Sequence, residues 1–323
     1  MKLAIVTQPL LANYGGILQN YALQEALRHM GHEPVTIDYQ QHISPKKYCR
    51  ALLRTILKGA PYKPFYQKRP ESFDAFIKKH INCSPEVRHY KSSLLNGIDA
   101  VIVGSDQVWR PIYNQYSLED MFLRFAKGFN GPRIAYAASF GSNSWNPSRC
   151  RAVKCATLAK QFTAVSVREE SGIQLCKDSL GIDAVQMPDP VFLLEARDYL
   201  DICKGIQKSK EVYLFAYILD RTPAVDAQIE ELSGETGLKV VYCSSGEEST
   251  MPVEGWLAAI RDAAAVVTDS FHGCAISRIL NKDLVVVKNE ARGADRFSIF
   301  DSEMDFAAMR TKAYGFLNKA LGI

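Results

Sequence analysis

Short apolar runs alternate with helical patterns along this chain of 323 residues. Apolar runs of this kind are typical of buried strands, and they fall at residues 3–7, 35–39, 100–103, 134–138, 164–167, 184–187, 212–219, 238–243, 265–268 and 284–287. Apolar residues spaced by three and four positions predict helices, which we expect at 17–30, 223–236, 254–263, 272–281 and 305–320. Strands that alternate with helices indicate parallel sheets covered by helices, so the predicted fold class is α/β.

A polar stretch at residues 201–211 separates two series of these elements, and Pro188 and Pro190 end the strand pattern before it. We therefore expect two Rossmann-like domains, residues 1–195 and 210–323, that face each other across a cleft. Ligands of open α/β sheets bind beyond the carboxyl ends of the strands. The residues directly after each strand are therefore the candidates for a functional site.

The composition, with 47% hydrophobic and 23% charged residues, is that of a globular protein with a sizeable core. No apolar run approaches the roughly 18 residues that a membrane-spanning helix needs. The first ten residues, MKLAIVTQPL, hold too short an apolar run for a signal peptide. These features lead us to expect a cytoplasmic location.

Eight cysteines occur in the chain, but no two of them form a CxxC pair. Several lie within apolar patterns, as free buried cysteines do. We expect reduced thiols and no metal site.

Positive charge is concentrated in residues 46–69, which hold eight Lys and Arg and no acid, whereas the whole chain carries +4. Without that segment the net charge is 4 − 8 = −4, so we expect no nucleic-acid partner. Lys46, Arg50, Arg54 and Lys58 would form one stripe of a helix. Such a stripe either lies on an anionic membrane surface or is an ordinary solvated face.

The segment after the first strand, QPLLANYGGILQ, predicts a helix start capped by Asn13. Gly15 and Gly16 either let a ligand approach the backbone of the helix or simply make a tight turn. Exposed N–H groups at a helix start attract anions and polar ligands. The GxGxxG fingerprint is absent, so Asp38 alone does not indicate a dinucleotide.

After the third strand comes GSDQVWRP, which holds Ser105, Asp106 and Trp109. A small turn, a carboxylate and an aromatic ring on one loop are groups that bind a sugar. The alternative is a loop whose Trp109 fills the core. Ser139 follows the fourth strand and adds a weak polar signal at the same edge.

The fifth strand ends in SVREE, which places Arg168 at the edge of the cleft. A guanidinium there suits a carboxylate or a phosphate. The alternative is an ion pair with Glu169 or Glu170.

The segment VVTDSFHGCAISRIL places His272 on a turn between a strand and a helix, whereas the other five histidines lie at or before His89. Histidine is the natural acid or base near neutral pH, although it could also merely cap the helix. Backbone N–H groups from Gly273 onward could hold an anion. Asp269 and Ser270 are immediate neighbours that face different ways, so a catalytic triad is not expected.

The next strand runs into a stretch that contains Lys288, Arg292 and Arg296. With Arg168 from the facing domain, these cations indicate a small, strongly anionic ligand in the cleft.

Taken together, NYGGILQNYALQ, GSDQVWRP, YAASFG, VSVREESG, MPDP, VTDSFHG and RGADRF resemble the polysaccharide pyruvyl transferase family over most of the chain. The resemblance implies a GT-B-like fold and transfer of pyruvate from phosphoenolpyruvate to two hydroxyls of a sugar. A cyclic ketal forms and phosphate leaves. It implies no metal and no organic cofactor.

The resemblance also implies roles for the residues at the strand ends. The catalytic pair would be His272, as acid or as base, and Asp269, which would either orient His272 or cap the helix. The residues expected to bind the donor are Arg168, Ser270, Gly273, Arg292 and Arg296. The residues expected to face the acceptor are Asn13, Tyr14, Gly15, Gly16, Ser105, Asp106 and Trp109.

Two other functions remain open on the residues alone. A GT-B glycosyltransferase would use a nucleotide sugar, for which Glu290 could hold the ribose, and a non-catalytic relative would only bind glycans. An acceptor linked to polyprenyl phosphate would give the stripe from Lys46 to Lys58 a purpose at the inner membrane surface.

Overall fold

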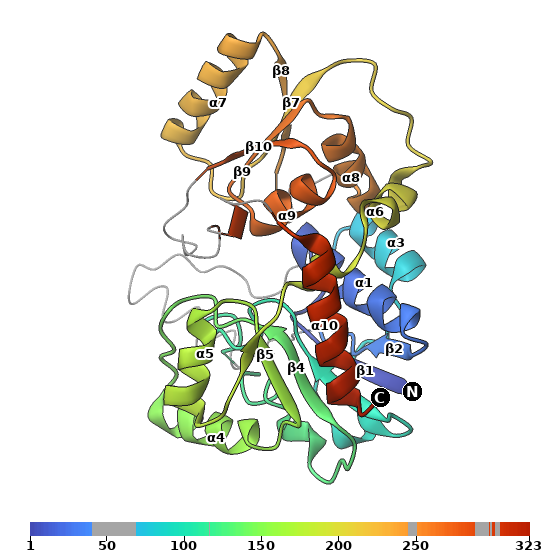
Figure 1. Ribbon diagram of the computed structural model, residues 1–323, viewed down its shortest axis with the longest axis vertical. Coiled ribbons are helices and arrows are strands. Elements are labelled where there is room, and N and C mark those ends of the chain that lie inside the picture. The colour runs from blue at the N-terminus through green and yellow to red at the C-terminus, as the bar shows by residue number, and fades with distance from the viewer. Residues whose placement is uncertain (41–68, 116, 245–250, 288–296, 298, 301–303) are drawn as a thin grey trace.

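The computed structural model describes residues 1–40, 69–115, 117–244, 251–287, 297, 299–300 and 304–323. In Figure 1 two parallel sheets lie one above the other, each flanked by helices. The basic stripe from Lys46 to Lys58 lies outside the described residues, as do Lys288, Arg292 and Arg296.

The first sheet has six strands in the order β2-β1-β3-β4-β5-β6, all parallel. Its strands are β1 (Lys2–Val6), β2 (Glu33–Thr36), β3 (Ala100–Val103), β4 (Arg133–Ala138), β5 (Ala164–Val167) and β6 (Val185–Gln186). All four residues of β3 are buried, which fits a central strand covered on both faces. The strand order reverses between β1 and β3, so their carboxyl ends open a crevice of the kind that holds ligands.

The second sheet has four parallel strands in the order β10-β9-β7-β8. Its strands are β7 (Tyr213–Tyr217), β8 (Lys239–Cys243), β9 (Ala265–Thr268) and β10 (Asp283–Val286). The order reverses between β7 and β9, which places the turn after β9 at a second switch point.

The α-helices of the described residues are α1 (Tyr14–His29), α3 (Glu71–His80), α4 (Arg149–Ala159), α5 (Ser171–Leu175), α6 (Ala196–Cys203), α7 (Pro223–Thr236), α8 (Val253–Asp262), α9 (Phe271–Ile279) and α10 (Phe306–Leu321). Short 3₁₀ turns are η1 (Ser92–Leu95), η2 (Arg124–Ala126) and η4 (Pro190–Leu193), and η3 (Cys176–Leu180) is a single π turn. The predicted α/β class is confirmed, and the predicted helices correspond to α1, α7, α8, α9 and α10 with ends shifted by a few residues.

An aromatic cluster joins the two halves on the side of α1, α3 and α8 (Figure 1). Tyr14 at the start of α1 stacks on Trp256 of α8, with 5.1 Å between ring centroids, and also contacts Phe73 and Tyr217. The side chains of Tyr14 and Trp256 are fully buried. Aromatic side chains bury large areas of apolar surface. This cluster therefore closes the junction of the two halves on this side.

The last helix, α10, runs down over the first sheet (Figure 1). Ala313, Leu317 and Leu321 share a core with Leu3 and Ile5 of β1. The sequence predicts residues 305–320 as part of the second domain, but their apolar face lies against the first. The division at about residues 195 to 210 stays a prediction.

The Leu317→Ala variant tests this assignment of α10. Leu317 is fully buried in the core of the first sheet, so the substitution should lower the free energy of unfolding by about 2–5 kcal/mol. Urea denaturation measures the loss. Lys319→Ala, at an exposed position of the same helix, should change it by no more than about 0.5 kcal/mol. Equal effects of the two variants would contradict the placement of α10.

Candidate active site

Polar side chains from both sheets meet at the carboxyl ends of the strands. Arg168 follows β5, Asp189 follows β6 and Ser139 follows β4 in the first sheet, whereas His272 follows β9 in the second. All four residues are buried. Arg168 and His272, both expected at strand ends, therefore lie on either side of Asp189.

Arg168 lies at the centre of this group, and its side chain is only 4% exposed. Its Nη1 donates to Oδ2 of Asp189 at 3.0 Å, and its Nε donates to Oε1 of Glu169 at 2.9 Å. A carboxyl oxygen of Asp106 lies 3.9 Å away. Burial alone would lower the pKa of Arg168, but Glu169, Asp189 and Asp106 raise it above its usual range.

Asp189 is the residue of this group that the sequence does not reveal. Its side chain has no exposed surface. Oδ1 accepts from the backbone N–H of Val191, and Oδ2 accepts from Arg168 and from the Ser105 hydroxyl at 3.3 Å. Burial would raise the pKa of Asp189, but His272, and then Arg168, lower it to about 2. The MPDP segment could have pointed to this acid, because it directly follows a strand.

His272 meets Asp189 across the junction of the two halves, with Nε2 3.5 Å from Oδ2. This separation is long for a hydrogen bond, so the pair attracts as charges when the imidazole is protonated. Nε2 is buried and makes no hydrogen bond within the described part of the chain. The other side of the ring lies against α1, because a Cβ at Gly15 would be 2.1 Å from Nδ1.

The TDSFHG turn is built by short hydrogen bonds. The Ser270 hydroxyl caps α9 by accepting from the N–H of Gly273 at 3.3 Å. Gly273 also allows α9 to approach β9, because a Cβ there would be 2.6 Å from Oγ1 of Thr268. Ser270 and Gly273, expected to bind the donor, thus bind each other and fix where His272 lies.

The carboxylate of Asp269 binds the backbone of the loop after β7. Its Oδ1 accepts from the N–H of Leu219 at 2.6 Å and its Oδ2 from the N–H of Asp220 at 3.0 Å. The carboxylate therefore ties the β9–α9 turn to the loop after β7. Ser270, not Asp269, is the cap, and Asp189 is the acid beside His272.

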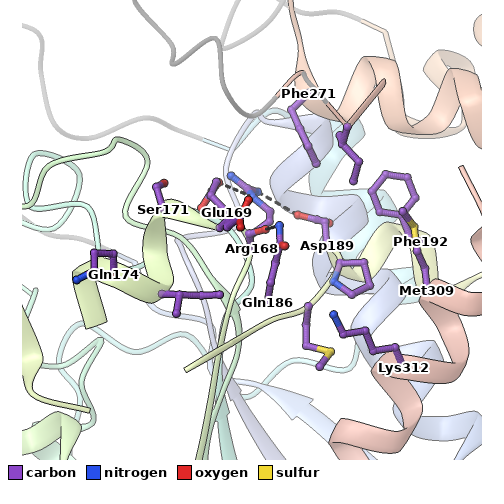
Figure 2. A pocket seen from close by; sticks show the side chains of 15 residues that line it. Arg168, Glu169, Ser171, Gln174, Gln186, Asp189, Phe192, Phe271, Met309 and Lys312 are labelled. Atoms are coloured by element: carbon purple, nitrogen blue, oxygen red, sulfur yellow. Dashed lines mark hydrogen bonds and ion pairs between the residues drawn. The ribbon is translucent and has the colours of Figure 1, made fainter. Parts of the chain in front are cut away.

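A cavity of about 780 Å³ opens beside this charge cluster. Figure 2 shows Ser171 and Gln174 of α5 on one side, Met309 and Lys312 of α10 on the other, and Arg168 and Asp189 between them. Phe271, one residue before His272, lies at its upper edge, with Arg168 4.9 Å from the ring centroid. The cavity therefore combines charged groups, amides and apolar surface.

The prediction that Trp109 faces the acceptor is wrong. Its ring has no exposed surface and stacks on Phe122 with 4.8 Å between centroids. The same prediction is wrong for Tyr14, because this side chain lies in the aromatic cluster between the halves. Ser105 is fully buried, and its hydroxyl donates to Ala137 and Asp189. It therefore supports Asp189 from within the core.

The other expected residues lie at the predicted edge. Asn13 is exposed, and its side chain caps α1 by accepting from the N–H of Gly16 at 3.2 Å, which confirms the predicted cap. Asp106 faces Arg168, and Gly15 contacts His272.

Within the described residues there is no cluster of three or more His, Cys, Asp or Glu that could hold a metal ion. No helix in the same parts of the chain is long and apolar enough to cross a membrane.

A family model described as "Polysaccharide pyruvyl transferase" matches residues 13–290. The chain belongs to this family. Membership makes the protein a transferase, and its general activity is the transfer of pyruvyl groups in polysaccharide synthesis. Proteins with curated descriptions give no significant match to the sequence.

Solved structures similar to this member of the family show its fold. UDP-GlcNAc 2-epimerase from Neisseria meningitidis, bound to UDP-GlcNAc, aligns over 100% of this chain and 93% of its own with 11% identity and a TM-score of 0.52. The enzyme of the same name from Methanocaldococcus jannaschii aligns over 98% and 93% with 12% identity and a TM-score of 0.50. The pyruvyl transferase thus has the GT-B fold of two parallel sheets, as predicted.

The contact between Gly15 and His272 can be tested by adding one methyl group. A Cβ at position 15 would overlap the imidazole, so Gly15→Ala should lower the free energy of unfolding by about 1–3 kcal/mol and displace His272. Thermal or urea denaturation measures the loss.

Gly16→Ala is the matched control, because its Cβ would lie 3.4 Å from the nearest atom, the amide nitrogen of Asn13. It should unfold almost as the wild type does. If Gly15→Ala were equally well tolerated, the close contact with His272 would be contradicted.

Proposed function

We propose that this protein transfers pyruvate from phosphoenolpyruvate onto two hydroxyls of one sugar, in a polysaccharide or in its lipid-linked precursor. The product is a cyclic ketal, and phosphate is released. The proposal rests on family membership together with one structural observation: Arg168 and Asp189 line one cavity, and His272 of the other sheet lies 3.5 Å from Asp189.

The donor carries a carboxylate and a phosphate, so its site must supply positive charge. The described residues that line the cavity include the cations Arg168 and Lys312 and the acids Glu169, Glu170 and Asp189. Because Arg168 is already paired with two of these acids, further cations are needed. We propose Lys312 and the basic stretch 288–296, with Arg292 and Arg296, for this role.

The proposed reaction begins with a proton added to the methylene carbon of phosphoenolpyruvate, which makes the central carbon electrophilic. One sugar hydroxyl attacks that carbon and gives a tetrahedral adduct. Phosphate then leaves, and the second hydroxyl closes the ketal. Two hydroxyl protons are released, of which one balances the proton placed on the methylene and the other leaves with phosphate. The proposed reaction needs no metal and no organic cofactor.

We propose His272 as the group that moves one of these protons, either to the methylene or from a hydroxyl. It comes from the second sheet, and the proton would move through Nε2, which makes no hydrogen bond within the described part of the chain and lies 3.5 Å from Oδ2 of the acid that Arg168 holds. A positioned histidine contributes about 10²–10⁴-fold to a rate when it acts as acid or base.

The acceptor is proposed to lie in the same cavity. Ser171, Gln174 and Gln186 offer groups that can bind hydroxyls, and Phe271 offers an aromatic surface. This replaces Trp109 as the ring that contacts the sugar. For a lipid-linked acceptor, reaction at the cytoplasmic face of the membrane would bring the stripe from Lys46 to Lys58 near anionic lipid.

Incubation of the protein with phosphoenolpyruvate and a panel of glycosyl acceptors tests the function. We expect phosphate release that depends on the acceptor, and a product whose mass increases by pyruvic acid less one water. Transfer from nucleotide sugars instead would overturn the proposal, and binding of glycans without turnover would identify a non-catalytic relative.

The His272→Gln variant tests the proposed proton transfer. Phosphate release should fall by roughly 10²-fold or more, while thermal stabilisation by phosphoenolpyruvate persists, because bound ligand stabilises the folded state. His29→Gln, at an exposed position of α1, should leave both unchanged. Wild-type turnover in His272→Gln would remove this residue from the mechanism.

A further inference from the structure

His272 has an acidic neighbour on the opposite half of the molecule, and the proposed function does not yet use it. We propose that Asp189 is the positioning residue of His272: it holds the imidazole in one orientation where the two sheets meet. This inference rests on the proposed function, in which His272 moves a proton.

Contacts within the first half of the molecule hold both the backbone and the carboxylate of Asp189. Pro188 and Pro190 fix the backbone on either side, and the carbonyl of Pro188 accepts from the hydroxyl of Tyr136 at 3.1 Å. Oδ1 is held by the N–H of Val191, which leaves Oδ2 directed towards Arg168 and His272. A site held in this way does not have to reorganise during a reaction.

The ring of His272 is confined from two sides. Nε2 faces Asp189, and the edge with Nδ1 lies against the backbone of Gly15. Rotation of the ring would bring it into α1 or remove it from the carboxylate. The first half of the molecule therefore sets the orientation of a side chain that belongs to the second.

Charged groups from both halves of the molecule surround His272. The strand ends of the first sheet contribute Asp189, Glu169 and Asp106 against one cation, Arg168. On its own element, Asp269 is engaged by backbone N–H groups, and the start of α1 adds positive N–H dipoles on the opposite side. Asp189 is the nearest of these groups, and its low pKa of about 2 means that it stays charged at neutral pH.

Acid unfolding tests the pair without any substrate. The pKa of Asp189 is about 2 in the folded protein and about 3.9 in an unfolded chain. Its stabilisation is therefore complete above about pH 5 and is lost as the pH falls towards 2. His272→Gln removes the charge that helps to keep this pKa low, so Asp189 contributes less stability above about pH 5 and the loss on acidification should be smaller.

The measurement is the free energy of unfolding of the wild type, His272→Gln and the control His29→Gln between about pH 6 and pH 2. We expect His29→Gln to follow the wild type and His272→Gln to lose less stability between about pH 5 and pH 2. Parallel curves for His272→Gln and the wild type would show that the two groups are not coupled and would overturn the proposal.

The combined effect of the two residues on kcat tests the consequence for catalysis. Asp189→Asn removes the charge that faces His272, so kcat should fall in the wild-type background but hardly fall further in His272→Gln, because the effects of residues that act as a unit are not additive. Asp189→Glu keeps the charge and should retain part of kcat. An equal fold loss of kcat in both backgrounds would indicate a purely structural residue and contradict the proposal.

The two readouts separate the possible failures. If the wild type transfers no pyruvate from phosphoenolpyruvate, the proposed function fails, whereas the unfolding curves still decide whether Asp189 and His272 are coupled. If circular dichroism shows that Asp189→Asn does not fold, the comparison of His272→Gln with His29→Gln alone decides the coupling.

Discussion

The buried carboxylate of Asp189 accepts a hydrogen bond from Arg168 of its own sheet and faces His272 of the other sheet. Nitrogen atoms of both residues lie within 3.5 Å of Oδ2. Charges in such a place cost much free energy unless they are paired and hydrogen-bonded. Here Oδ1 is satisfied by the backbone and Oδ2 by Arg168 and Ser105. The arrangement of the strand ends around the site therefore depends on this one acid.

The start of α1 sets how the two halves meet. Asn13 caps the helix, Tyr14 fills the aromatic cluster with Trp256, and Gly15 leaves room for His272. Three consecutive residues thus end one strand-to-helix connection and join two sheets. Because Tyr14 closes one side of the junction, the cavity lies on the other, beside Arg168 and α10.

Periodicity and strand ends predicted the α/β fold, the cap at Asn13, and the places of Arg168 and His272, because each depends on residues close in sequence. Other features depend on distant neighbours. Trp109 has the residue type of a sugar-binding ring, but Phe122 and Phe140 cover it in the fold. The role of Asp189 requires His272, which lies 83 residues further along the chain, and the position of α10 requires an apolar face on β1. No local pattern carries this information.

A buried pair of a carboxylate and an arginine, with two partly exposed carboxylates beside it, is a poor way to gain stability, since well-packed apolar side chains of similar size often do as well or better. The aromatic cluster around Tyr14 already joins the halves without such a cost. Stability alone therefore does not explain why Arg168, Asp189 and His272 lie together beside a cavity. Their position is explained if the charges act on a reactant, with His272 and Arg168 keeping Asp189 ionised, Asp189 holding the orientation of His272, and the junction of the sheets bringing the three residues together.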